Sequence, residues 1–258
     1  MPLFDPFLLL DRFGSSNPED YLAGFPWHPH RGIETVTYVL EGEVEHGDTL
    51  GNTGVIGSGD VQWMNSGSGI IHQEMPKRSE GTMSGFQLWV NLPAREKMSV
   101  PAYRGLTRAD FPEVSTDNGS VVKVIAGAYG GVEGPVTGIP VDPTYLDVTV
   151  PARGSFELAT QAGYTAFAHT ITGNVQFDGT DDRSVPAGET ALFGPGGPVR
   201  AHALETDARF LLVSGRPLHE PVAWYGPIVM NTRDQLIEAV RELNGGEFVK
   251  HRRPIVEE

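Results

Sequence analysis

Short β-rich runs separated by glycine-containing turns make up most of the first hundred residues. A second series of such runs begins near residue 146, after a stretch rich in Pro, Gly and Asp that holds one more strand candidate at 121–125. The runs lie at 33–40, 55–56, 61–64, 70–75 and 86–90 in the first series and at 146–150, 166–171, 175–177, 190–193 and 210–213 in the second. Short strands at this spacing are typical of a sandwich or barrel, so the pattern predicts a mainly all-β chain.

The two series resemble degenerate copies of one unit. Residues 37–46 align with residues 168–177, and residues 56–64 align with residues 185–193 after a turn that is two residues shorter. Such self-similarity indicates a duplicated barrel. We therefore expect an N-terminal barrel over 1–110, a loop-rich connection over 111–140, and a second barrel over 141–258.

One helix is expected near the C-terminus, against one of the barrels. Thr232 and Gln235 have the spacing of a capping box, and Gly245 and Gly246 supply a stop signal. Between them an apolar stripe recurs at helical spacing, formed by Leu236, Ile237, Val240 and Leu243.

Composition agrees with a turn-rich β protein and limits its chemistry. The 258 residues correspond to roughly two domains, and 32 glycines and 20 prolines supply the turns. The chain has no cysteine, so disulfides and thiolate ligands are excluded. Any metal must be bound by His, Asp or Glu.

The net charge of −14 disfavours direct binding to nucleic acid, because the phosphate backbone carries the same sign. The one dense basic run, Lys250–Arg253, is interpreted as a solvated end. The N-terminus has neither the basic region of a signal peptide nor an apolar run long enough to span a membrane. We expect a cytoplasmic monomer that binds no membrane.

Two short clusters have the spacing of metal ligands. His28 and His30 are two positions apart, as are His72 and Glu74, so on strands each pair would project from one face. If the two strands face each other inside one barrel, three nitrogens and one oxygen converge and leave about two open positions on an octahedral ion. Such a set suits Fe(II), Mn(II), Ni(II) or Co(II), and open positions are typical of catalytic sites.

Glu34 is a second carboxylate with suitable spacing. It follows His30 by four positions, which is even parity on a strand, so it could point at the same ion. It could instead hydrogen-bond an imidazole as an outer partner of the metal site.

The second series lacks the same ligands. By the repeat offsets, Ala159 and Gln161 replace the first histidine pair, and Ala201 and Ala203 stand near the positions of His72 and Glu74. We therefore expect one metal site per chain. The remaining histidines are expected to be structural or exposed; they are His46, His169, His202, His219 and His251.

Three long motifs carry a specific resemblance to a known family. The run from Phe25 to Gly42, followed by residues 57–64 and 69–76, resembles the pirin family of bicupins. An Asp-Pro-Phe motif at 5–7 and the segment 220–232 extend the resemblance over almost the whole chain. It implies two tandem cupin barrels (double-stranded β-helices of the jelly-roll type) with a C-terminal helix. Pirins usually carry a further segment before Asp-Pro-Phe, so we expect either a start codon placed too far downstream or a shorter member.

The resemblance also implies a ligand set. In pirins the N-terminal cupin binds one metal, usually iron, through three histidines and one glutamate, which by motif position are His28, His30, His72 and Glu74. Glu34 is then an outer partner and not a ligand. Fe(II) is the implied ion, with Mn, Ni, Co, Cu or Zn as alternatives.

The activity implied by the resemblance is quercetin dioxygenation, in which O₂ opens a flavonol ring and carbon monoxide is released. Glu74 is expected to accept the proton of the flavonol 3-hydroxyl, and Trp27, Met64 and Phe86 to line an apolar pocket for the aromatic substrate. Two alternatives remain open. One is a non-enzymatic, metal-binding regulator that acts through protein partners, and the other is a cupin oxygenase of another small substrate.

Overall fold

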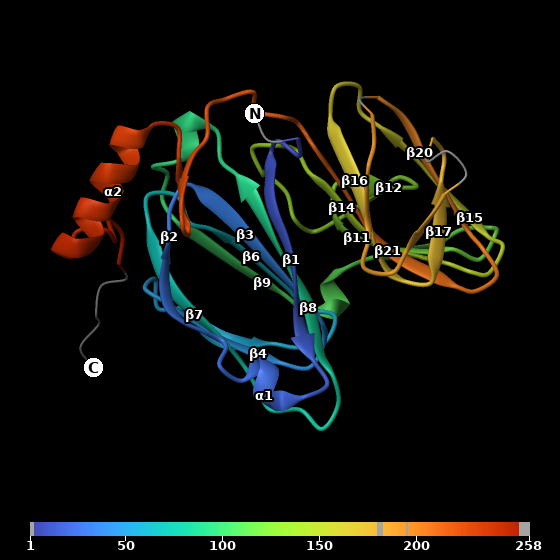
Figure 1. Ribbon diagram of the computed structural model, residues 1–258, viewed down its shortest axis with the longest axis horizontal. Coiled ribbons are helices and arrows are strands. Elements are labelled where there is room, and N and C mark those ends of the chain that lie inside the picture. Colours follow the sequence, from blue (N-terminus) through green and yellow to red (C-terminus); the bar gives the residue numbers. More distant parts are fainter. Residues whose placement is uncertain (1–2, 180–182, 195, 253–258) are drawn as a thin grey trace. The chain divides into compact units, whose positions relative to one another are not determined.

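The computed structural model describes residues 3–179, 183–194 and 196–252, and these residues form two compact units (Figure 1). The first unit contains residues 7–108 and the described residues from 219 onward, and the second contains residues 4–6 and 109–218. Arg253, the last residue of the basic run, lies outside the described residues.

The first unit is built from two antiparallel sheets. One has the strand order β1-β8-β3-β6-β9 and the other the order β2-β7-β4-β5. Because successive side chains of a strand point to opposite faces of the sheet, every second side chain of each sheet points into the barrel. The strands are β1 (Phe7–Ser15), β2 (Phe25–His30), β3 (Ile33–Glu41), β4 (Val44–Asp48), β5 (Thr53–Ile56), β6 (Val61–Asn65), β7 (Ile70–Pro76), β8 (Met83–Asn91) and β9 (Ala102–Leu106), with the short helices α1 (Pro18–Tyr21) and η1 (Ala94–Glu96).

The second unit repeats this construction with other residues. Its sheets have the orders β10-β11-β14-β21-β16-β19 and β15-β20-β17-β18. The strands are β10 (Glu113–Ser115), β11 (Val121–Ala126), β14 (Thr144–Val150), β15 (Ser155–Thr160), β16 (Thr165–Thr172), β17 (Asn174–Phe177), β18 (Ser184–Pro186), β19 (Thr190–Leu192), β20 (Gly197–Ala203) and β21 (Ala208–Gly215), with a hairpin of β12 (Ala128–Tyr129) and β13 (Val132–Glu133). The turn η2 (Arg108–Asp110) precedes it.

The expected duplication is confirmed by the strand orders. β2-β7-β4-β5 recurs as β15-β20-β17-β18, and β8-β3-β6 recurs as β21-β16-β19. The chain is therefore mainly all-β with two cupin barrels, as the sequence pattern and the resemblance predict.

Strand register corrects the expected alignment of the two copies. Val44 lies opposite Pro76 in the first barrel, and its counterpart Val175 lies opposite Ala203 in the second. Counting back along β20, the positions of His72 and Glu74 are taken by Val199 and Ala201, two residues before the alanines expected from the sequence. Both belong to the buried apolar cluster of the second barrel, so the conclusion that it lacks these ligands is unchanged.

The C-terminal segment differs from the expected domain division. From His219 onward it groups with the first unit and not with residues 109–218. It contains the hairpin of β22 (Ala223–Tyr225) and β23 (Ile228–Met230) and the helix α2 (Arg233–Gly245), drawn in red in Figure 1. Ile228, Met230, Ala239 and Phe248 form an apolar cluster against which Ile71 of β7 packs.

The expected helix is present, with one difference in its buried face. Thr232 and Gln235 form the reciprocal capping box, and Gly246 closes the helix in the left-handed conformation. Ile237 is exposed, whereas Ala239 is buried. In the described part of the chain, no helix combines the length and apolar character needed to cross a membrane.

Arg31 anchors this segment to the first barrel. Its guanidinium, which is 2% exposed, lies 2.7 Å from the carboxylate of Glu242, donates to the carbonyl oxygen of Phe248 and stacks on the Phe248 ring. The following Gly32 has φ +78°, and a Cβ atom there would lie only 2.0 Å from the carbonyl oxygen of Val229. The turn after β2 thus needs a glycine because the C-terminal segment crosses it closely.

We expect Glu242→Gln to lower the free energy of unfolding by about 3 kcal/mol, because the buried Arg31 guanidinium would lose its charged partner. Glu238→Gln on the same helix is the matched control. Glu238 pairs with Arg241 at an exposed position, so its loss should cost no more than about 0.5 kcal/mol. Urea unfolding of both variants measures the difference, and equal effects would contradict the role given to Arg31.

Candidate metal centre

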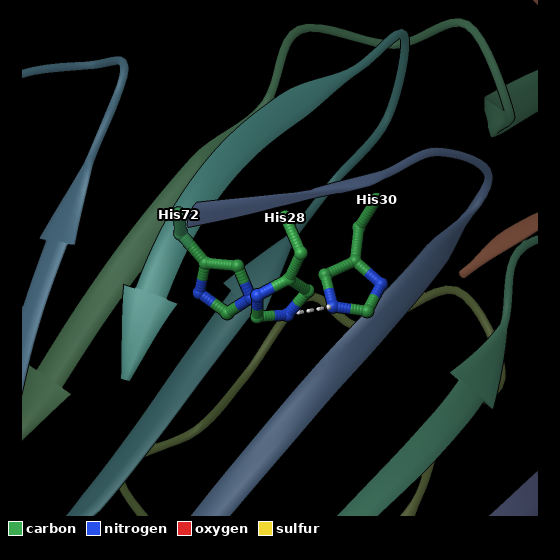
Figure 2. A group of neighbouring side chains, drawn as sticks. All are labelled: His28, His30 and His72. Atoms are coloured by element: carbon green, nitrogen blue, oxygen red, sulfur yellow. Dashed lines mark hydrogen bonds between the residues drawn. The ribbon is translucent and has the colours of Figure 1, made fainter. Parts of the chain in front are cut away.

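Three histidines meet where β2 and β7 pair. His28 lies directly opposite His72 in the antiparallel register, and His30 follows His28 by two positions on β2. All three side chains therefore leave the sheet on the same face. Figure 2 shows His28 and His30 from one strand and His72 from its neighbour, with their rings turned toward one another.

The distances between these rings suit one metal ion. The Nε2 atoms of His28 and His30 are 3.0 Å apart, and one ligand atom from each of the three residues lies within 4.8 Å of the others. Two imidazole nitrogens that each bind an ion at ~2.1 Å, at right angles, lie ~3 Å apart. His28 and His30 thus have the separation of neighbouring ligands.

In the rings of His28 and His30, hydrogen bonds to backbone carbonyls fix which nitrogen carries the proton and which is free to bind an ion. His28 Nδ1 lies 2.9 Å from the carbonyl oxygen of Pro26, and His30 Nδ1 lies 3.3 Å from that of Pro227. Each Nδ1–H donates to its carbonyl, which leaves the Nε2 lone pair free to bind a metal. Neither ring nitrogen of the fully buried His72 has a partner among the described residues. A divalent ion between the three rings would give one of the two His72 nitrogens a partner, so the residues fit a metal.

Burial keeps two of the rings in the neutral form that binds metals. Loss of contact with water, together with the neighbouring histidines, lowers the pKa of both His30 and His72 well below the usual value. A neutral imidazole offers a lone pair that a protonated one lacks.

Glu74 lies on the inward face of β7, two positions after His72, but its oxygens are not part of the histidine group. One carboxylate oxygen accepts a hydrogen bond from Thr37 Oγ1 at 2.7 Å, and the other accepts one from Gln87 Nε2 at 2.8 Å. Gln87 in turn accepts from the indole N–H of Trp89, whose ring packs edge-on against His30. The carboxylate is thus held beside the histidines by an ordered chain of donors.

A fourth buried histidine was not anticipated at the site. His46 on β4 lies opposite Glu74, stacks on Tyr103 and has its Nε2 3.2 Å from Asp48. Its ring centroid is 5.5 Å from that of His72. The sequence carried a signal for it, because His46 and Asp48 have the same spacing of two positions as the other pairs, although no strand was predicted there.

The structure does not place Glu34 among the partners of the histidines. Its carboxylate accepts from Trp63 Nε1 at 3.1 Å, on the face of β3 opposite to that of Thr37. The even spacing from His30 does not bring Glu34 to the same face, because Arg31 and Gly32 turn the chain between β2 and β3. Burial raises the pKa of Glu34 to about 7, although the Trp63 hydrogen bond and Arg104 oppose the shift.

Of the three residues expected to line a substrate pocket, Met64 faces the barrel interior. It lies opposite Thr35, on the same face as Thr37. Phe86 lies opposite Tyr38, on the other face of the sheet.

Trp27 is also turned away from the histidines. It alternates with His28 along β2, and its ring lies 3.6 Å from the position of a Cβ atom on Gly47, over the outer side of the sheet. Its side chain is 54% exposed. Alternation along the strands thus removes Phe86 and Trp27 from a pocket beside the metal site.

The other histidines lie apart from this group. His169 is buried and has its Nδ1 2.9 Å from the hydroxyl of Thr190, while His202, His219 and His251 are exposed. Among the described residues, the three histidines on β2 and β7 are the one group close enough to share an ion.

Comparison with known proteins assigns the family. The model of the Pirin family matches residues 1–90, and that of the Pirin C-terminal cupin domain matches residues 145–249. The chain belongs to the pirin family.

Related pirins are similar over most of their length. A pirin-like protein of Caulobacter vibrioides is 48% identical over 95% of this chain and 88% of its own, and pirin-like protein 2 of Arabidopsis thaliana is 42% identical over 96% and 78%. Among solved structures, quercetin 2,3-dioxygenase of Acinetobacter baumannii is 34% identical, with a TM-score of 0.85 over 95% of this chain and 87% of its own. A bacterial pirin of Escherichia coli in complex with nickel(II) shares the fold at 23% identity, with a TM-score of 0.64 over 83% of each chain.

We expect the metal-free pirin to lose stability as the pH falls below about 6.5, the pKa of an unfolded histidine. Since the folded pKa values of His30 and His72 are lowered, the unfolded chain binds more protons there, and each histidine costs up to ~1.4 kcal/mol per pH unit. Thermal unfolding from pH 7 to 5 measures the loss. A His30→Gln/His72→Gln variant should show a shallower fall, and His202→Gln the same fall as the parent; equal slopes in all three would contradict the assignment.

Glu34 should have the opposite dependence on pH. Its carboxyl pKa of about 7 in the folded protein exceeds the ordinary value of 4.5, so stability declines as pH rises through this window and levels off above 7. We expect Glu34→Gln, which keeps an acceptor for Trp63, to be more stable than the parent at pH 8 by roughly 3 kcal/mol and nearly equal to it at pH 4.5. Chemical unfolding at the two pH values tests this, and a pH-independent effect would argue against a protonated Glu34.

Proposed function

We propose that this pirin is a metal-dependent dioxygenase that opens the ring of a flavonol such as quercetin with O₂. The observation that carries the proposal is the convergence of the imidazoles of His28, His30 and His72. The buried ring nitrogens of His72 have no partner within the described residues. The similarity to the Acinetobacter enzyme supports the same substrate class.

His28, His30 and His72 would hold the ion through ring nitrogens, and Glu74 is proposed as the fourth ligand. Fe(II) is the proposed ion, because three nitrogens and one carboxylate with open positions suit it. When bound, the ion would supply Lewis acidity toward the flavonol oxygens and a site for O₂.

Glu74 is proposed to receive the proton of the flavonol 3-hydroxyl. The O–H bond breaks, the proton passes to a carboxylate oxygen, and the electron pair stays on the flavonol oxygen. Thr37 and Gln87 each donate to this carboxylate, which holds it in place and leaves lone pairs for a further donor. Because the base is held in a fixed position, less entropy is lost when the reactive geometry forms.

The flavonol is proposed to approach past His28. This ring is partly exposed, whereas His30 and His72 are buried. The small cavity beside Glu74 has a volume of about 10 Å³, room for roughly one water, so it cannot admit a flavonol. Two exposed aromatic rings lie close to the histidine group: Phe25 next to His28, and Trp224 next to Trp89, which packs on His30. These rings replace Trp27 and Phe86 as the proposed contacts of the substrate.

The test is turnover of quercetin by protein loaded anaerobically with Fe(II), Mn(II), Ni(II), Co(II) or Cu(II) and then exposed to air. We expect loss of the flavonol absorbance together with release of carbon monoxide. His72→Ala should lose both bound metal and turnover, and His202→Ala, at an exposed position of the second barrel, should retain both. Glu74→Gln should lower kcat at least a hundredfold while metal remains bound.

Absence of turnover with every metal would refute the dioxygenase proposal. Unchanged metal content in His72→Ala would refute the ligand assignment separately. A protein that binds metal through these histidines without turning over quercetin would instead fit the regulatory alternative or another substrate.

A further inference from the structure

The second barrel contains a cleft of about 490 Å³ that the proposed dioxygenase chemistry does not use. Leu158 and Thr160 of β15, Thr144 of β14 and Ser214 of β21 line it. Leu158 packs against the apolar core of this barrel, and Thr160 is on the same face of its strand. Thr144 and Ser214 lie opposite each other, on the faces of their strands that also carry the core residues Leu146 and Leu212. The cleft is therefore the open end of the barrel interior.

Strand register identifies this cleft with the metal centre of the first barrel. Leu158 lies opposite Val199 as His28 lies opposite His72, so Leu158 and Thr160 take the places of His28 and His30. Ala168 corresponds to Thr37 in the repeat and lies opposite Leu212, as Thr37 lies opposite Gln87. Ser214 thus takes the place of Trp89, and the cleft lies at the position that the histidine group occupies in the first barrel.

Much of the rim of the cleft comes from the segment 127–143, which precedes β14. Asp142 on this rim has φ +48°, and its carboxylate accepts a hydrogen bond from the hydroxyl of Tyr164 at 2.8 Å. Glu133 adds a second carboxylate. The hydrogen bond between Asp142 and Tyr164 ties the rim segment to the turn that precedes β16.

The lining determines the class of molecule that would bind. Hydroxyls of Thr144, Thr160 and Ser214 and the two carboxylates surround the cleft, and none of the described residues that line it is a lysine or arginine. The guanidinium of nearby Arg216 donates to the carbonyl oxygen of Pro140. Carboxylates accept hydrogen bonds and repel anions, and hydroxyls both donate and accept. A volume of this size holds a small organic ligand.

We propose that this cleft is a metal-free binding site for an uncharged, polyhydroxylated molecule of mono- or disaccharide size. Asp142 and Glu133 accept hydrogen bonds from its hydroxyl groups, and the threonine and serine hydroxyls contact it at the floor. In this barrel the entrance of the cupin has been kept, while the metal ligands have been replaced by Leu158, Thr160 and Val199. The site does not depend on the metal centre or on its reaction.

Saturation-transfer NMR and calorimetry of the full chain with glucose, maltose and myo-inositol test the proposal. We expect at least one of these probes to bind saturably at one site per chain, with unchanged affinity in His72→Ala and in the presence of EDTA. Glucose 6-phosphate and choline are the charged controls, and binding of these alone would overturn the assigned class. Absence of binding by all three polyols at millimolar concentration would overturn the site.

Variants locate the binding. Asp142→Asn should weaken it about tenfold through loss of a charge-assisted hydrogen bond, without disturbing the fold, because asparagine also adopts positive φ. Ser214→Leu should abolish it by filling the floor. Asp207→Asn, the same change at an exposed turn of this barrel outside the cleft, should leave affinity unchanged. Binding that survives both cleft variants would place the polyol elsewhere and refute the proposal.

Discussion

The antiparallel register between β2 and β7 is the constraint on which the candidate metal centre of this pirin depends. It sets His28 opposite His72 and places His30 on the same face. A slip of one residue would turn the side chains of one strand to the outer face and separate the rings. The register is held from both sides, because β7 also pairs with β4, while β2 is followed directly by Arg31, which pairs with Glu242 of the C-terminal segment. Distant packing therefore maintains the local geometry.

The two barrels share strand order but differ in what they bury. The first buries Thr37, His46 and Glu74 together with His30 and His72, whereas the corresponding part of the second is filled by apolar residues such as Val199 and Ala201. Buried polar groups cost free energy unless they find partners. In the first barrel, mutual hydrogen bonds and the proposed metal offset that cost. The two barrels thus share a topology, but one has a polar interior with a candidate metal centre and the other has an apolar core.

Much of this arrangement was predictable from sequence, because it depends on alternation within single strands. The pairs His28 and His30, and His72 and Glu74, keep their predicted faces, and the repeat predicted the shared topology. The errors arose where a prediction crossed a turn or an unknown sheet. Glu34 was placed on the face of His30 by its even spacing, although a turn separates the two residues, and Phe86 was given a face that only the register with β3 fixes. The attachment of α2 to the first unit depends on Arg31 and Glu242, whose pairing over more than two hundred residues leaves no local signal.

The carbonyl oxygen of Pro227 that orients His30 lies 197 positions further along the chain. During synthesis, at 5–20 residues per second, roughly ten to forty seconds separate the two. Throughout that interval His30 lacks the acceptor that fixes its tautomer, and Arg31 lacks Glu242 and Phe248. The three histidines are translated early, yet the partners that fix His30 and Arg31 follow only with residues 227–248. A chain that stops before Pro227 would therefore carry all three histidines of the candidate metal centre but not the acceptor that orients His30.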